Sequence, residues 1–276
     1  MRLFQIDQRL EYPLSVLQAG PFAIRYTYAR SRETQQGDDI GQDYLTYKVT
    51  NDGIMFCVCD GVSQSYYGNL AAKYLGDALL QFMSESDCFN SMDSEYVKYR
   101  LCSSLQRMTA QATAMINRHE IPTHIGGLFR EVLEEKRMKG SETTFVCGKI
   151  IYSAAQKKGQ ITAACLGDTG IRLFDYGTEI PGLLTGEISH WNRWSSCDGV
   201  LGEGPSILTV SLERDASGPN CIQVFTDGLM GYKKWRRPPD DAELRQMIHT
   251  SHDHAASDDV SFLEISWNEV TGGFKR

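Results

Sequence analysis

Aspartates at the ends of apolar runs are the residues of this sequence most suited to chemistry. The stretch 54–61 reads IMFCVCDG, in which six consecutive apolar residues are followed by Asp60 and Gly61. A run of this length and composition predicts a strand covered on both faces. A carboxylate at the end of a buried strand needs a partner, because removing its charge from water is costly. Asp60 therefore either caps the helix expected after Tyr66 or binds a cation.

The same arrangement recurs along the chain. Five strand ends carry such a carboxylate, at Asp43, Asp60, Asp168, Asp227 and the pair Asp258 and Asp259. If these groups converge, they repel one another and have raised pKa values unless divalent cations neutralise them. Oxygen-only sites of this kind suit magnesium or manganese rather than zinc. The remaining alternative is that the aspartates only cap helices and turns, in which case no metal binds.

The order of these motifs resembles that of a known enzyme family. Six segments between residues 20 and 266 carry the likeness: GQDYLTYKV, CVCDGVS, SETTFVCGKI, CLGDTGIRLF, VFTDGLMGY and SDDVSFLEI. In this order they resemble the metal-dependent protein phosphatases, the PPM or type 2C serine/threonine phosphatases, in their bacterial form. Several motifs in a fixed order are a more specific signal than one Asp-Gly pair.

The resemblance implies hydrolysis of phosphoserine and phosphothreonine by a water that bridges two manganese or magnesium ions, without a phosphoenzyme. In such a site Asp60 would bridge both ions, and Asp168 would hold a third, weaker one. The implied metal ligands are Asp43, Asp60, Gly61, Asp168, Asp227 and Asp258, and the implied catalytic residues among them are Asp60, Asp227 and Asp43. The implied partners are a phosphorylated protein and a cognate serine/threonine kinase.

The arginine that would bind the substrate phosphate is not at its usual place. Family members have it a few residues before the position of Asp43, but Asp38 and Asp39 fill that slot here. Arg30 and Arg32 are the nearest candidates, and they reach the phosphate only if QQGDD is an insertion. The alternative is that both are surface arginines.

Two further positions depart from the family pattern. Gln42 stands where many animal members have a glutamate ligand, and Val62 replaces a histidine that some members use as an acid. Without that histidine, water would have to supply the proton to the leaving group. These departures keep a second hypothesis open, a catalytically weak or inactive phosphatase-like module that regulates or binds.

Composition indicates one soluble domain over residues 1–276. The chain is 41% hydrophobic, and its 35 acidic and 28 basic residues give a net charge of −7, which disfavours a nucleic-acid partner. Most of the eight cysteines lie in apolar runs, as free thiols do in a reducing cytoplasm. Asp7, Glu11 and Pro13 argue against an N-terminal signal peptide or membrane span, so we expect a cytoplasmic protein without a membrane partner.

The fold class expected is α+β, a four-layer α-β-β-α sandwich of two antiparallel sheets flanked by helices. Residues 1–19 are expected to form an edge strand or an arm. The strands at 21–29, 43–49 and 54–61 are expected to form a contiguous antiparallel meander. The strands after residue 142 are expected to begin a second sheet. Strands are predicted at 21–29, 43–49, 54–61, 143–152, 160–165, 171–176, 207–212, 221–225 and 260–265, and helices at 66–83, 94–118, 126–140 and 242–248.

Two segments between these elements also invite a functional interpretation. Residues 185–204 lack periodicity and contain Trp191 and Trp194, which could anchor on a surface or on substrate, so this segment is expected to be the flap that the family has beside its site. His249, His252 and His254 have a spacing that suggests zinc, but no fourth ligand is near, and an exposed turn is favoured.

Overall fold

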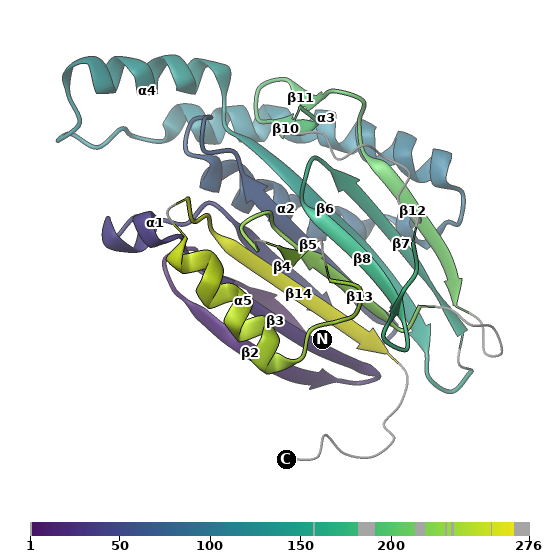
Figure 1. Cartoon of the computed structure of the whole chain (residues 1–276). Helices are drawn as coiled ribbons and strands as arrows, with labels where there is room; N and C mark the ends of the chain where they lie inside the picture. The colour runs from purple at the N-terminus through teal and green to yellow at the C-terminus, as the bar shows by residue number, and fades with distance from the viewer. Residues whose placement is uncertain are drawn as a thin grey trace.

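Two antiparallel sheets pack against each other between helices in the computed structural model of the chain (Figure 1). It describes residues 2–156, 158–181, 191–212, 219–229, 231–232, 235–254 and 256–267. The larger sheet contains β1 (Arg2–Gln5), β4 (Tyr44–Val49), β5 (Gly53–Gly61), β6 (Glu142–Ser153), β7 (Lys158–Leu166), β10 (Arg193–Ser195), β11 (Gly199–Leu201) and β12 (Ser206–Leu212). The smaller sheet contains β2 (Tyr12–Ala19), β3 (Phe22–Ala29), β8 (Gly170–Asp175), β9 (Thr178–Glu179), β13 (Cys221–Phe225) and β14 (Val260–Trp267).

The strand order shows how the chain moves between the sheets. The larger sheet runs β1-β4-β5-β6-β10-β11, with β7 also on β6 and β12 on β7, and the smaller runs β2-β3-β14-β13-β8-β9. Along the described strands the chain therefore changes sheet five times, between β1 and β2, β3 and β4, β7 and β8, β9 and β10, and β12 and β13. The core between the sheets is apolar and fully buried, as at Phe56, Val58 and Ile222.

Helices cover the outer faces of both sheets (Figure 1). On the larger sheet lie α2 (Gly68–Glu85) and α3 (Ser94–Arg118), joined by the 3₁₀ turn η1 (Asp87–Asn90), and on the smaller sheet lies α5 (Asp241–Asp253). Leu75, Leu79 and Met83 form a buried stripe on α2 because they recur every four residues. The short α1 (Arg32–Gln36) and the protruding α4 (Gly127–Lys139) bury no residue.

The structure confirms the expected fold class of two antiparallel sheets with flanking helices. The helix predicted at residues 94–118 is α3, and Gly140 follows the last residue of α4 as expected. Asp240 and Glu243 form a capping box at the start of α5. The extent of the domain over residues 1–276 stays a prediction.

The predicted meander is wrong. β3 belongs to the smaller sheet and β4 and β5 to the larger, and the polar segment between them contains α1 as well as turns. β6 and β7 join β5 rather than beginning a new sheet. Residues 1–19 give two edge strands, one in each sheet.

The flap predicted at residues 185–204 stays a prediction, but the expectation that Trp194 anchors on a surface or on substrate is wrong. Residues 193–201 form the hairpin β10–β11, which pairs with β6, while residues 182–190 lie outside the described residues. Trp194 is fully buried, stacks on Tyr74 and donates its Nε1–H to the carbonyl of Leu105 at 3.1 Å. It cannot anchor on substrate, whereas Trp191 is 77% exposed.

All eight cysteines are free thiols. Of those in apolar runs, Cys57, Cys59, Cys147 and Cys221 are buried and Cys165 is partly buried. Within the described part of the chain, no helix combines the length and the apolar character needed to cross a membrane.

Candidate metal centre

The acidic residues of the larger sheet meet at one end of β4 and β5. Asp60 is the penultimate residue of β5, and Asp43 directly precedes β4. Tyr44 pairs with Cys59 in the antiparallel register, so Asp43 and Asp60 lie at the same end of adjacent strands. Both are positioned by strands that are buried along nearly their whole length.

In the smaller sheet, two carboxylates lie at the same end of the adjacent strands β13 and β14. Asp227 follows β13 after one residue, Asp258 lies just before β14, and Phe225 pairs with Phe262 between those strands. Gly228 packs so closely on this turn that a Cβ atom there would lie 2.0 Å from the carbonyl oxygen of Asp259. Only glycine therefore allows the Asp227 turn to approach the start of β14.

Thr226 joins these two ends across the sandwich. Its hydroxyl donates to Oδ2 of Asp43 at 2.7 Å and accepts from the backbone N–H of Ser261 at 2.9 Å. All three residues are buried. Sequence reasoning missed Thr226, and the only available signal was a hydroxyl residue directly before the Asp-Gly pair in VFTDG.

Asp168 lies where the chain crosses from β7 to β8. Gly167 has φ +95°, and the hydroxyl of Thr169 lies 2.7 Å from that of Thr144 on β6. The crossing therefore holds Asp168, which is 9% exposed, beside the Asp60 strand, since Thr144 pairs with Asp60.

Asp60 does not cap α2, so that alternative is wrong. The N-cap of α2 is Tyr67, which makes no side-chain capping bond. Ser141, which directly precedes β6, provides the missing capping bond. Its hydroxyl accepts a hydrogen bond from the backbone N–H of Ala71 at 3.1 Å and donates one to the carbonyl of Tyr67. Gly61 instead packs on the helix start, and a Cβ there would lie 2.5 Å from the carbonyl carbon of Gly68.

The carboxylates of the site disfavour one another's charge. Burial, followed by the charges of Asp227 and Asp258, raises the pKa of Asp60 well above its usual range, and the carboxyls of Asp60 and Asp227 are within hydrogen-bonding reach. Burial and the charges of Asp60 and Asp259 likewise raise the pKa of Asp43. Desolvation is also the main cause of the raised pKa of Asp258.

Asp259 has a different function from its neighbour Asp258. Its Oδ1 accepts from Ser31 N at 2.6 Å and its Oδ2 from Gln42 N, so it ties β14 to the segment that links the two sheets. Burial raises its pKa, and these backbone donors oppose the rise. Sequence reasoning noted this aspartate but did not foresee its structural role.

The donor set suits a hard divalent cation. The side chains are carboxylates at strand ends with mutually raised pKa values, and the buried Oε1 of Gln42, next to Asp43, has no hydrogen-bond partner. Among the described residues, no three His, Cys, Asp or Glu side chains already stand in a coordination shell. The residues fit magnesium or manganese by the chemistry and charge of their side chains.

The two candidate phosphate arginines differ in their environment. The Nε–H of Arg30 donates to Oε1 of Glu11 at 2.8 Å, and its Nη1 donates to the carbonyl of Asp39 at 2.9 Å. Arg32 is exposed at the first position of α1. Binding of phosphate by either residue stays a prediction.

The three histidines are placed differently from the expected turn. His249 and His252 lie on α5, and His254 is its C-cap residue. The helical spacing of the first two was hidden because their surroundings are polar. Within the described residues they form no metal-binding group.

Comparison with known proteins adds a likeness of fold. No protein-family model and no curated protein matches the sequence. The serine/threonine phosphatase Stp1 from Staphylococcus aureus superposes with a TM-score of 0.58 at 13% identity, covering 94% of this chain and 98% of that one. The chain has the fold of a bacterial serine/threonine phosphatase.

Two further structures support this result. The S. agalactiae serine/threonine phosphatase gives a TM-score of 0.55 at 14% identity, over 90% of this chain and 100% of that one. RsbX in complex with magnesium gives 0.53 at 14% identity, over 92% of this chain and 100% of that one.

Replacing Thr226 tests whether it holds the two sheets together at the site. Thr226→Val keeps the shape but leaves Asp43 and the N–H of Ser261 without this partner, at a cost of about 1–3 kcal/mol. We expect urea unfolding with chelator to show this loss for Thr226→Val and a much smaller one for the control Thr226→Ser, which keeps the hydroxyl. Equal stability of the two variants would mean that the hydroxyl does not contribute.

Proposed function

We propose that this protein is a metal-dependent serine/threonine phosphatase that removes phosphate from phosphoserine and phosphothreonine with manganese or magnesium. The observation that carries the proposal is the convergence of acidic strand ends from both sheets at one end of the sandwich, where burial and mutual repulsion raise the pKa values of Asp60 and Asp43. A cluster of that kind needs positive charge, and a phosphatase of this fold uses it for hydrolysis.

In this proposal Asp43, Asp60, Gly61, Asp168, Asp227 and Asp258 would hold the metal ions, and Asp168 would belong to a third one. When bound, such cations lower the pKa of a water and neutralise charge on the phosphoryl group. Asp60 has the central place, because the charges of Asp227, Asp258 and Asp168 all act on it.

The neighbouring residues position these ligands. Thr226 fixes the carboxylate of Asp43, and the close packing of Gly61 on Gly68 fixes the end of β5. No side-chain nucleophile is required. Ser65, which lies near the site, uses its hydroxyl to donate to the carbonyl of Val62 and to accept from Glu142 N.

The proposed partners are a phosphorylated protein and a cognate kinase, in the cytoplasm.

The proposed function can be tested by measuring hydrolysis of an aryl phosphate and of a phosphothreonine peptide by the purified full chain. We expect turnover with added manganese and its loss with excess chelator. A manganese-saturated preparation that cleaves neither substrate would refute the phosphatase proposal.

The arginine that binds substrate phosphate can be identified by kinetics. Arg32 is exposed, whereas Arg30 is held by Glu11 and the carbonyl of Asp39. We therefore expect Arg32→Gln to raise KM for the peptide about tenfold or more, in line with the loss of a charge-assisted hydrogen bond. Arg30→Gln should change KM less, and the reverse order would assign the phosphate to Arg30.

The second candidate function is a phosphatase-like module that binds or regulates without efficient turnover. It is favoured by the engagement of Arg30 with Glu11 and by Val62 in the place of an acid. Full manganese occupancy without hydrolysis, together with stable binding of a phosphopeptide, would support this alternative.

A further inference from the structure

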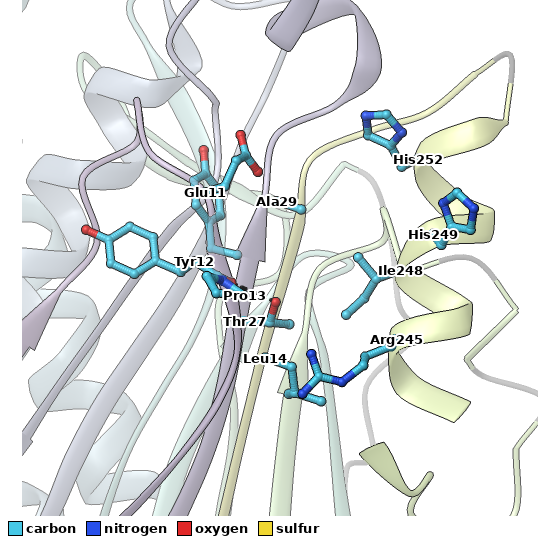
Figure 2. A pocket seen from close by; sticks show the side chains of 11 residues that line it. Glu11, Tyr12, Pro13, Leu14, Thr27, Ala29, Arg245, Ile248, His249 and His252 are labelled. Atoms are coloured by element: carbon cyan, nitrogen blue, oxygen red, sulfur yellow. Dashed lines mark hydrogen bonds between the residues drawn. The ribbon is translucent and has the colours of Figure 1, made fainter. Parts of the chain in front are cut away.

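A pocket of about 340 Å³ lies between the hairpin β2–β3 and α5 (Figure 2). Small-molecule sites in proteins commonly measure roughly 300–1,000 Å³, so this volume suits a small ligand. The lining consists of Glu11, Tyr12, Pro13, Leu14, Thr27, Tyr28 and Ala29 from the hairpin side and Arg245, Ile248, His249 and His252 from α5. None of these residues is a proposed metal ligand.

The pocket exists because β2 is irregular at this point. Tyr12 pairs with Tyr28 and Ser15 with Tyr26, so Pro13 and Leu14 together oppose the single residue Thr27. An extra residue of this kind bends its strand, and proline is tolerated there because β2 is an edge strand. The bend leaves space between the hairpin and α5 that the core does not fill.

The pocket has an apolar floor and a basic wall. Leu14 is only 9% exposed, and Ile248 extends from α5 toward it (Figure 2). Arg245, His249 and His252 follow one another at helical spacing along the same face of α5. Figure 2 shows the Arg245 guanidinium extending over the pocket toward Leu14.

The charges of the pocket favour an anion. Arg245 is exposed and makes no ion pair or hydrogen bond with any other residue that the structure describes. On the opposite wall the carboxylate of Glu11 is already neutralised by Arg30, which donates from Nε to Oε1 at 2.8 Å and from its backbone N–H to Oε2 at 3.0 Å. His249 has its own carboxylate neighbour, since its Nε2 lies 3.4 Å from Oδ2 of Asp253.

We propose that this pocket binds a small amphipathic carboxylate. Its apolar tail would lie on Leu14 and Ile248, and its carboxylate would accept two parallel hydrogen bonds from the guanidinium of Arg245, the geometry in which arginine binds carboxylates best.

The ligand would also act on α1, because two walls of the pocket hold the segment around that helix. Glu11 binds Arg30 just before α1, and His252 donates from Nε2 to Oε1 of Gln35 within α1 at 3.2 Å. A ligand that bridges these walls restricts their separation and so slows local opening of α1. Any effect on turnover rests on the proposed function, since it would act through Arg30 and Arg32.

Calorimetric titration of the full chain with octanoate tests the site. We expect saturable binding of one octanoate, weakened about tenfold or more in Arg245→Gln through loss of the charge-assisted bonds. Ile248→Trp, which fills the pocket from the half-buried face of α5, should also weaken it. The matched control Arg107→Gln removes an exposed arginine on α3 and should leave affinity unchanged. Octanol, which lacks the charge, should bind wild type and Arg245→Gln equally.

Two results would overturn the binding site. One is the absence of saturable octanoate binding to the wild type, and the other is equal affinity in wild type, Arg245→Gln and Ile248→Trp. Hydrogen exchange tests the coupling, since octanoate should slow exchange of the α1 amides in wild type but not in Arg245→Gln at the same concentration. Unchanged exchange at saturation would overturn the coupling. Neither measurement depends on phosphate release, so failure here and failure of the phosphatase proposal are distinguishable.

Discussion

Asp60→Asn should abolish phosphatase activity while leaving the metal-free protein as stable as the wild type or more stable. The folded-state pKa of Asp60 is raised by burial and by Asp227, Asp258 and Asp168, so its ionised form opposes folding. The folded-state pKa of Asp60 lies above the unfolded value of about 3.9. The protein therefore loses stability as the pH rises from that value toward the folded-state pKa, because the folded state holds the proton more tightly. A neutral asparagine removes this loss at pH 7.

The loss of activity has a separate cause. Changes to residues that only support metal ligands cost roughly 10–100-fold in activity, and loss of Asp60, the proposed bridging ligand, should cost more than about a hundredfold. Added manganese should stabilise the wild type by about 2.7 kcal/mol at a hundredfold excess over its dissociation constant, and the variant should lose much of that gain.

Thermal melts of both proteins, with chelator and with manganese, measure the two effects together. Asp259→Asn is a useful comparison, because Asp259 accepts backbone bonds from Ser31 and Gln42 and its replacement should destabilise the metal-free protein. Identical manganese-induced shifts in wild type and Asp60→Asn would remove Asp60 from the metal site.

Trp194→Ala should destabilise the protein by about 3–5 kcal/mol, the usual cost of truncating a buried aromatic residue. The indole is fully buried, stacks on Tyr74 with ring centroids 6.1 Å apart and donates to the carbonyl of Leu105. Its loss would leave a cavity between α3 and the β10–β11 hairpin and would remove the hydrogen bond to Leu105.

The matched control is Trp191→Ala, only three positions away and 77% exposed. We expect it to change the free energy of unfolding by less than about 0.5 kcal/mol, as surface substitutions usually do. Urea unfolding of both variants provides the comparison. Similar losses of stability would contradict the assignment of Trp194 to the core and Trp191 to the surface.

The sequence predicts individual strands and helices well because each signal is local. The apolar run that ends at Asp60 is β5, and the helical stripe over residues 94–118 is α3. The partition of strands between the sheets is not local. β5 and β6 are buried on both faces, so no alternation indicates which sheet they join. The crossing between β3 and β4 is therefore visible only in the fold.

The candidate site shows the same division. Each acidic residue could be found from its place after or before an apolar run, but its neighbours could not. Thr226 acquires its importance only because the end of β13 lies opposite Asp43 on the other sheet. The two adjacent aspartates before β14 look alike in sequence, and only the backbone donors Ser31 and Gln42 identify Asp259 as the structural one.

Trp194 illustrates why irregular segments mislead. Its neighbourhood contains glycines and lacks periodicity, because β10 and β11 contain only three residues each. Strands this short leave no repeating pattern, although pairing with β6 places the indole in the core.

The measurement that tests the central claim most directly is anomalous diffraction from a crystal of the protein soaked in manganese. We predict at least two manganese peaks at the end of the sandwich, with Asp60 contacting both and Asp227 and Asp43 among the other ligands. The same soak of Asp60→Asn should lose at least one peak. Manganese bound elsewhere, or no peak beside Asp60 in the wild type, would contradict the account.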